Sequence, residues 1–98
     1  MVFGYEWKGK RLIPTRKASH EILELNLSIQ DVAEVLTNGF DCAPSRRQKG
    51  RAERCLRRNG KMLRVVVQEG EFMYPDSEKE GVYWIIHVSQ ETYKKGRW

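Results

Sequence analysis

The sequence lacks the short motifs by which many catalytic and cofactor-binding sites are recognised. Its 98 residues contain no P-loop, no Gly-x-Ser-x-Gly, no His-Glu-x-x-His and no glycine-rich dinucleotide turn. The two cysteines, Cys42 and Cys55, form no Cys-x-x-Cys pair, and no carboxylates cluster at metal-ligand spacing. We therefore expect no metal and no cofactor, and we expect both cysteines to be reduced, half-buried strand residues.

Long apolar runs are also missing. The longest, such as residues 65–67 and 83–86, are far too short to cross a bilayer, and no charged-then-apolar signal segment opens the chain. We therefore expect a cytoplasmic protein with no membrane partner. The length predicts a single domain over residues 1–98, with its functional site on the surface because there is little room for a cofactor cavity.

Positive charge is concentrated in one short stretch. Residues 46–64 hold nine of the eighteen Lys and Arg residues, and Glu53 is the only acid among them. Such a patch attracts polyanions, and nucleic-acid phosphates are the commonest intracellular polyanion whose binding is driven by counterion release. The patch predicts contact with an RNA or DNA backbone. The alternative is a solvated surface hairpin whose arginines bind nothing.

Capping signals predict two short helices in the first half of the chain. Thr15 is placed to cap a first helix that ends near residue 26. Ser28 and Asp31 have the spacing of a capping box, and an apolar stripe follows them up to Gly39. Before the helices, residues 3–13 alternate weakly, which is typical of a short edge strand or an ordered arm.

After residue 39 the apolar period changes from helical to alternating. Strands are predicted at residues 40–45, 52–58, 62–69 and 81–89. Asn59-Gly60 is a preferred two-residue hairpin turn and makes the second and third of these strands antiparallel. Residues 70–81 are predicted to be a mobile connector or a lid. The fold class that follows is α+β, with two N-terminal helices packed on one face of a twisted antiparallel sheet of about four strands.

Strict alternation along the last two strands separates two faces of this sheet. The apolar rows predicted to meet the helices are Leu63, Val65 and Val67 in one strand and Val82, Trp84, Ile86 and Val88 in the other. The opposite face would carry Arg64, Tyr83 and His87. The preceding strand would add two arginines in either register, Arg54 with Arg58 or Arg51 with Arg57.

This mixed face has the residue types of an RNA-cleaving site. A metal-independent ribonuclease needs no nucleophile of its own, because the RNA 2′-hydroxyl attacks the phosphate while the protein transfers protons and stabilises charge. The candidate catalytic residues are His87, Glu53 and Arg64. The candidate nucleic-acid-binding residues are Arg51, Arg54, Arg57, Arg58, Lys61, Tyr83 and Lys17. In the alternative interpretation, His87 only satisfies a neighbouring backbone group and Tyr83 only covers the sheet.

The strings TRKASHEILELNLSIQDVAEVLTNG, GRAERCLRRNGKMLRVVV and VYWIIHVSQET resemble a family of small prokaryotic domains that is placed near the RelE and BrnT toxins. The resemblance covers about residues 12–92. Lys17-Ala18 stand where that family commonly has a His-Ala pair. The resemblance implies a RelE-like fold and endoribonuclease toxin activity. It also implies RNA, including ribosome-associated mRNA, and a neutralising antitoxin as partners.

A second hypothesis belongs to a different functional class. The same basic patch would serve a non-catalytic module that binds RNA, DNA or an acidic protein such as an antitoxin tail. The sequence favours neither hypothesis strongly, and it leaves open whether the chain forms a homodimer.

Overall fold

The computed structural model describes residues 5–42 and 49–92. In these residues, two helices and six strands follow one another in the order β1 (Glu6–Trp7), β2 (Lys10–Pro14), α1 (Arg16–Glu24), α2 (Ile29–Asn38), β3 (Phe40–Asp41), β4 (Arg51–Arg58), β5 (Lys61–Met73) and β6 (Lys79–Thr92). The strands form one curled sheet in the order β1-β2-β6-β5-β4-β3. Neither helix is long and apolar enough to span a membrane.

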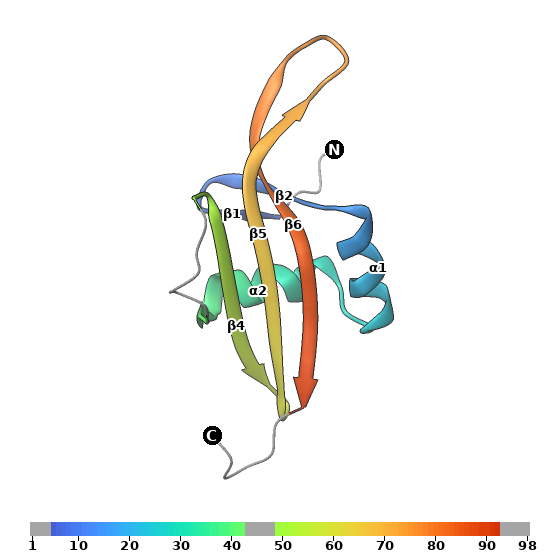
Figure 1. Cartoon of the computed structure of the whole chain (residues 1–98), viewed down its shortest axis with the longest axis vertical. Helices are drawn as coiled ribbons and strands as arrows, with labels where there is room; N and C mark the ends of the chain where they lie inside the picture. The colour runs from blue at the N-terminus through green and yellow to red at the C-terminus, as the bar shows by residue number, and fades with distance from the viewer. Residues whose placement is uncertain (1–4, 43–48, 93–98) are drawn as a thin grey trace.

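The predicted fold class, with its RelE-like sheet of about four antiparallel strands, is wrong. The sheet has six strands and is mixed, because β2 runs parallel to β6. Figure 1 shows α2 crossing behind the sheet, whereas α1 lies beside β6. β1 and β3 have only two residues each, too few to produce a recognisable alternation in the sequence.

Both predicted helices are present with the predicted caps. The Thr15 side chain accepts a hydrogen bond from the Ala18 N–H, and Ser28 and Asp31 form both bonds of the capping box. At the other end of α2, a Cβ on Gly39 would overlap backbone carbonyl groups, so the chain can pass there only as glycine. These termini are fixed by neighbouring residues, which explains why the sequence signals were sufficient.

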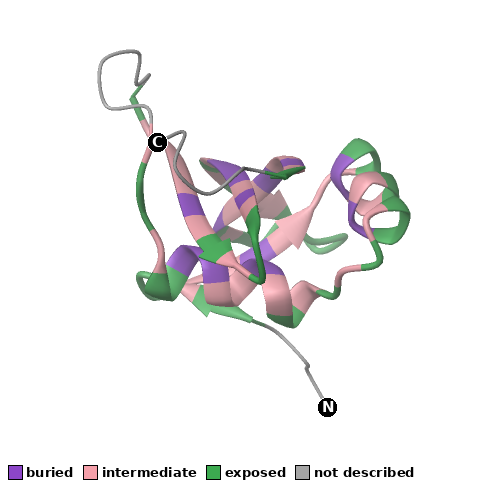
Figure 2. Cartoon of the chain, turned by 90° about the horizontal axis from the view of Figure 1, so that it is seen from below, coloured by how far each residue is buried: buried purple, intermediate pink, exposed green. Residues whose placement is uncertain are grey.

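The core lies between the helices and the central strands, and Leu63, Val65 and Val67 of β5 face it as predicted. In Figure 2 buried residues form short segments on the strands and on the inward sides of the helices. β6 does not keep the predicted alternation. Val66 pairs with His87 and Val67 with Ile85, so residue 86 has no partner and forms a β-bulge.

The bulge changes which β6 side chains are buried. Ile85 is fully buried in the core together with Val88. Trp84 is only half-buried, and its ring lies where a Cβ on Gly70 would be. Of the predicted row Val82, Trp84, Ile86 and Val88, only Val88 belongs to the core cluster. Placing Trp84 against the helices was therefore wrong.

Residues 70–81 are not the connector that the sequence predicted. β5 and β6 stay paired as far as Met73 and Lys79 and project beyond the other strands as a hairpin arm (Figure 1). Arg11 of β2 reaches toward the turn of the arm, where it donates to the Tyr74 hydroxyl at 2.9 Å and to Glu80 at 2.8 Å. The arm has no long apolar row, so its pairing left no clear alternation in the sequence.

The two cysteines are joined. β3 pairs antiparallel with β4, which brings the Cα atoms of Cys42 and Cys55 to 5.8 Å, and a disulfide links them. The expectation of two reduced thiols was wrong. It rested on an assumed reducing compartment, and the pairing of β3 with β4 was not visible in the sequence.

Candidate functional site

The chemically richest cluster lies where α1 packs against the edge of β6. β2 covers this edge only as far as the pairing of Pro14 with Ile85. Beyond that point the backbone N–H of Val88 would lack a strand partner. The Glu21 carboxylate of α1 accepts this N–H at 2.8 Å, so a helix side chain continues the hydrogen bonding that the neighbouring strand has ended.

The same carboxylate holds the imidazole of His87. Glu21 Oε2 lies 3.0 Å from His87 Nδ1. Lys17, one helical turn before Glu21, brings its Nζ to 3.6 Å from Glu21 Oε2 and 3.4 Å from His87 Nδ1. His87 is 38% exposed and Glu21 19% exposed. The site is therefore open to solvent while its carboxylate is held in place.

Glu21 is charged at neutral pH. Partial burial opposes its ionisation, but the Val88 N–H, His87 and Lys17 together outweigh this effect and hold the pKa of the carboxyl below its ordinary value. An ionised carboxylate beside Nδ1 favours the tautomer with its proton on Nδ1, because that N–H can donate to Glu21 Oε2. Nε2, on the far side of the ring, is then the nitrogen that can exchange a proton with a substrate.

Two of the three predicted catalytic residues, Glu53 and Arg64, are not hydrogen-bonded to the third, His87. Register places Glu53, Val66 and His87 in one row across β4, β5 and β6. Two strand spacings separate Glu53 from His87, about 10 Å, so Glu53 is too distant for a direct hydrogen bond. Arg64 lies in the neighbouring row, with Nη2 3.8 Å from Glu91. Its Nε is buried without a hydrogen-bond partner among the described residues.

Sequence reasoning missed Glu21, and it assigned Lys17 to nucleic-acid binding rather than to the His87 site. The available signal was the four-residue spacing between Lys17 and Glu21, which puts opposite charges on one helix face. That spacing does not reveal which strand the face will meet. The contact with His87 joins residues 66 positions apart and depends on where β2 ends.

Two of the predicted phosphate-binding arginines serve the fold instead. Arg54 donates from Nε to the Leu36 carbonyl at 3.2 Å, from Nη2 to the Gly39 carbonyl at 2.6 Å and from Nη1 to Asp41 at 3.1 Å. It thereby satisfies carbonyl groups at the C-terminal end of α2.

Arg58 is held in a similar way on the same side of β4. Its Nη1 lies 2.9 Å from Asp31 and 2.6 Å from Glu34, both on α2. Of the two registers left open by the sequence, the structure therefore places Arg54 and Arg58 toward α2. Arg51 and Arg57 lie on the opposite face, which also carries Arg64.

The remaining predicted contacts are spread over the molecule. Arg51 Nε donates to Gln68 Oε1 at 3.1 Å. Lys61 is exposed beside the Asn59–Gly60 turn, whose two residues both have positive φ as predicted. Tyr83 does not share the face of His87, because the bulge lies between them. It packs against Trp7 of β1, with ring centroids 5.1 Å apart.

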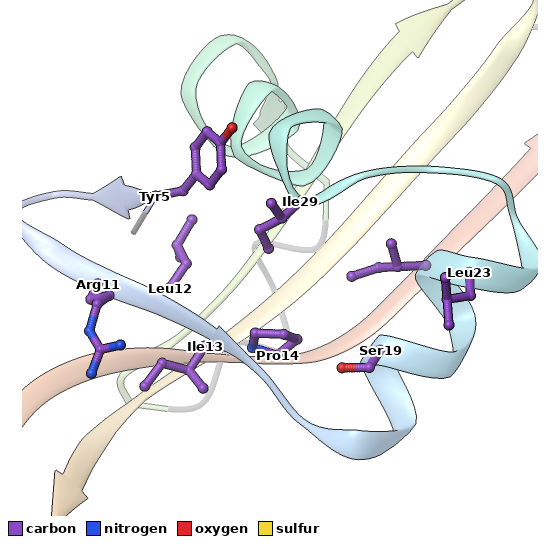
Figure 3. Close-up of a pocket in the computed structure, with 9 residues that line it drawn as sticks. Tyr5, Arg11, Leu12, Ile13, Pro14, Ser19, Leu23 and Ile29 are labelled. Atoms are coloured by element: carbon purple, nitrogen blue, oxygen red, sulfur yellow. The ribbon is translucent and has the colours of Figure 1, made fainter. Parts of the chain in front are cut away.

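An apolar groove lies on the opposite side of α1 from Lys17 and Glu21. It has a volume of about 440 Å³ and lies between β2, α1 and the start of α2 (Figure 3). Leu23 at its rim is 76% exposed. The cation in its lining, Arg11, is already paired with Glu80. The groove shares no lining residue with the cluster of Lys17, Glu21 and His87 and is separate from the His87 site.

Family models, curated proteins and solved structures give no match to this chain. The resemblance to the RelE and BrnT toxins therefore stays a prediction from the sequence. Among residues 5–42 and 49–92, no group of three His, Cys, Asp or Glu side chains is arranged to hold a metal ion.

Proposed function

We propose that this chain binds RNA and cleaves it at the cluster of Lys17, Glu21 and His87, without a metal ion. The observation that carries the proposal is the fixed carboxylate–imidazole pair, in which Glu21 is bound both to the Val88 N–H and to His87 Nδ1. Lys17 adds a positive charge next to the imidazole. A proton-transfer group beside a cation is what transesterification of RNA requires from a protein.

The proposed reaction begins at the RNA 2′-hydroxyl. His87 Nε2 accepts the hydroxyl proton as the 2′-oxygen forms a bond to phosphorus, and Glu21 stabilises the resulting imidazolium. The Lys17 ammonium stabilises the additional negative charge on the phosphate oxygens. The bond to the 5′-oxygen then breaks, that oxygen takes up a proton from solvent water, and the imidazolium returns its proton to the solvent. The products are a 2′,3′-cyclic phosphate and a 5′-hydroxyl end.

The test is incubation of the purified protein with single-stranded and structured RNA, with and without ribosomes, in the presence of EDTA. We expect cleavage to survive chelation and to leave a cyclic or terminal 3′-phosphate. A 2′-deoxy nucleotide at the cut position is the matched substrate control, because it removes the nucleophile. Intact RNA in every reaction would contradict the proposal.

The wider biological role follows as part of the same proposal. A toxin-type nuclease would act on cytoplasmic RNA, including ribosome-associated mRNA, and would be neutralised by an antitoxin protein. Induced expression should then stop growth while RNA loses integrity, and co-expression of the antitoxin should restore both. Growth arrest with intact RNA would count against the nuclease.

A non-catalytic binding module is the second candidate. It is favoured by Arg51 and Arg64, which lie on the sheet face away from α2, and by Lys61, which is exposed beside the Asn59–Gly60 turn. Binding that falls by about 0.7 to 0.9 logarithmic units per phosphate contact for each tenfold rise in salt would support a nucleic-acid partner. Such binding without cleavage would favour this candidate over the nuclease.

A further inference from the structure

A small polar pocket lies between the β1–β2 hairpin and the start of β4. The sheet curls so far that the β1–β2 hairpin approaches β4, although β6 and β5 lie between them in the strand order. The pocket between them has a volume of about 180 Å³. Its lining includes Trp7, Lys8, Asp41, Arg51, Arg54 and Tyr83.

The pocket is built from groups that the fold already holds in place. Lys8 and Gly9 both have positive φ and form the tight turn between β1 and β2, which puts Lys8 Nζ 4.6 Å from the centre of the Trp7 ring. Arg54 Cζ lies 5.9 Å from the same ring. The hydrogen bonds of Arg54 to Leu36, Gly39 and Asp41 use three of the five N–H groups of a guanidinium, which leaves two without a partner among the described residues.

The pocket carries an excess of positive charge. Among its lining residues Lys8 and Arg54 bring positive charge and Asp41 brings one negative charge, whereas the Arg51 guanidinium is turned to Gln68. An ion pair between Lys10 and Glu69 lies beside the Tyr83 ring and adds no net charge. The hydrogen bond between its two members raises the pKa of Lys10 and lowers the pKa of Glu69, so both stay charged at neutral pH.

Gly50, just before β4, brings the backbone close to Gln68 and Glu69 of β5. It has a φ of +77°, and a Cβ there would lie 3.0 Å from Gln68 Nε2 and 3.2 Å from Glu69 Cβ. A side chain at this position would therefore be strained and would push against the rim. Glycine therefore lets the backbone pass close to β5 at the point where β4 begins to line the pocket.

We propose that this pocket binds the phosphate monoester at the end of a nucleotide or oligonucleotide. A monoester carries about −1.5 to −2 charges at pH 7, against a single charge on an internal phosphodiester, so it gains more from Lys8 and Arg54. Arginine and lysine form short charge-assisted hydrogen bonds with phosphate oxygens. The Tyr83 ring beside them offers an aromatic surface to the attached nucleoside.

The inference does not depend on RNA cleavage, because the pocket shares no residue with the cluster of Lys17, Glu21 and His87. Its test uses two DNA oligonucleotides of one sequence, one with a 5′-phosphate and one with a 5′-hydroxyl, so that no 2′-hydroxyl is present. Titration of the full chain should show the phosphorylated oligonucleotide binding about tenfold tighter, the gain expected from charged hydrogen bonds. Equal affinities would overturn the assignment to an oligonucleotide end.

Lys8→Gln is the informative variant, since Lys8 is exposed in a turn and its loss should not unfold the chain. It should remove most of the preference for the phosphorylated oligonucleotide. Lys61→Gln is the matched control, because it removes one exposed positive charge elsewhere and should weaken both oligonucleotides equally. A preference that persists in Lys8→Gln would locate the phosphate outside this pocket and overturn the proposal.

Competition with inorganic phosphate shows whether the pocket takes free phosphate or the terminal phosphate of an oligonucleotide. We expect inorganic phosphate to compete with the phosphorylated oligonucleotide in the wild type and not in Lys8→Gln. If phosphate binds but the two oligonucleotides bind equally, the pocket takes free phosphate and the oligonucleotide source is excluded. His87→Ala should leave all these affinities unchanged, so failure of the nuclease proposal and failure of this one can be told apart.

Discussion

The arginines of β4 carry far more charge than the cluster at the edge of β6, but the cluster has the side chains better arranged for chemistry. β4 contains Arg51, Arg54, Arg57 and Arg58 within eight residues. Arg54 and Arg58 are nevertheless engaged by carbonyl groups and acids of their own chain. The cluster of Lys17, Glu21 and His87 has only one residue of each kind, yet it holds an imidazole against an ionised carboxylate.

The comparison shows that charge counted along a sequence is not charge presented at a surface. Backbone carbonyl groups at the C-terminal end of α2 require hydrogen-bond donors. The N-terminal half of the same helix carries the acids Asp31 and Glu34. Arginines on a strand packed beside that helix are therefore engaged in large part by groups of the fold itself. His87, by contrast, has a defined hydrogen-bond partner, because the Glu21 side chain that accepts the free Val88 N–H at the edge of β6 also contacts its imidazole.

The largest expected effect sharpens the β6 side of the comparison. His87→Ala should lower the rate of RNA cleavage by about a hundredfold or more, which is the usual contribution of a general acid–base group. RNA binding should change little, because the imidazole is not part of the basic surface. Single-turnover cleavage and a separate binding titration measure the two effects.

His20→Ala is the matched control for that experiment. His20 lies on α1 like Lys17 and Glu21 but is exposed. Its replacement should leave the cleavage rate unchanged. An equal loss in both histidine variants would mean that α1 or the overall fold has been disturbed, and the role of His87 would not stand.

The next effect tests the structural role of β4. Arg54→Gln should destabilise the protein by about 2 kcal/mol, because carbonyl groups at the end of α2 lose a charged donor in a partly buried place. Lys61→Gln, an exposed change on β5, should stay within about 0.5 kcal/mol. Urea unfolding of both variants measures the difference. Equal stabilities would show that Arg54 is not needed to complete the helix end.

The part of this architecture that could be predicted from the sequence is the local part. The caps at Thr15 and Ser28 and the Asn59–Gly60 turn depend on residues within a few positions, and each was located correctly. The apolar row of β5 was also clear, because its alternation is uninterrupted. These features are determined by steric and hydrogen-bond rules that act between neighbours.

The rest depended on contacts between distant residues. A single unpaired residue at position 86 reversed the faces of Trp84 and Ile85, and no signal in the sequence marks that bulge. The parallel pairing of β2 with β6 required knowledge of how α1 and α2 return the chain. The same pairing ends at Pro14 and leaves the edge that Glu21 occupies, so the site could not be assembled before the topology was known.

Glu21→Gln is expected to have an intermediate effect and to depend on pH. It should slow cleavage by roughly tenfold, corresponding to about 1.4 kcal/mol of lost hydrogen bonding to His87. The pKa of Glu21 is lowered in the folded protein, so its contribution to stability is complete above the ordinary carboxyl pKa of about 4.3 and is lost as the pH falls through the lowered value. The stability gap between wild type and variant should therefore narrow in acid, as urea unfolding at several pH values would show. A gap that widens on acidification would contradict this assignment.

The smallest effect concerns Arg58. Arg58→Gln should cost only about 0.5 kcal/mol at neutral pH, because an ion pair that is about one-third exposed gains little over its hydrated charges. The pKa of Asp31 is lowered first by the Ser28 N–H and only secondarily by Arg58, so this variant should still lose stability as the pH falls below the ordinary range of about 4. Asp31→Asn should remove that acid dependence and disturb the capping box, at a cost of about 1 kcal/mol. Urea unfolding at neutral and acid pH measures both variants. If Arg58→Gln proved as costly as Arg54→Gln, the two arginines would be equally structural, and the difference between a helix-end donor and a surface ion pair on the same strand would disappear.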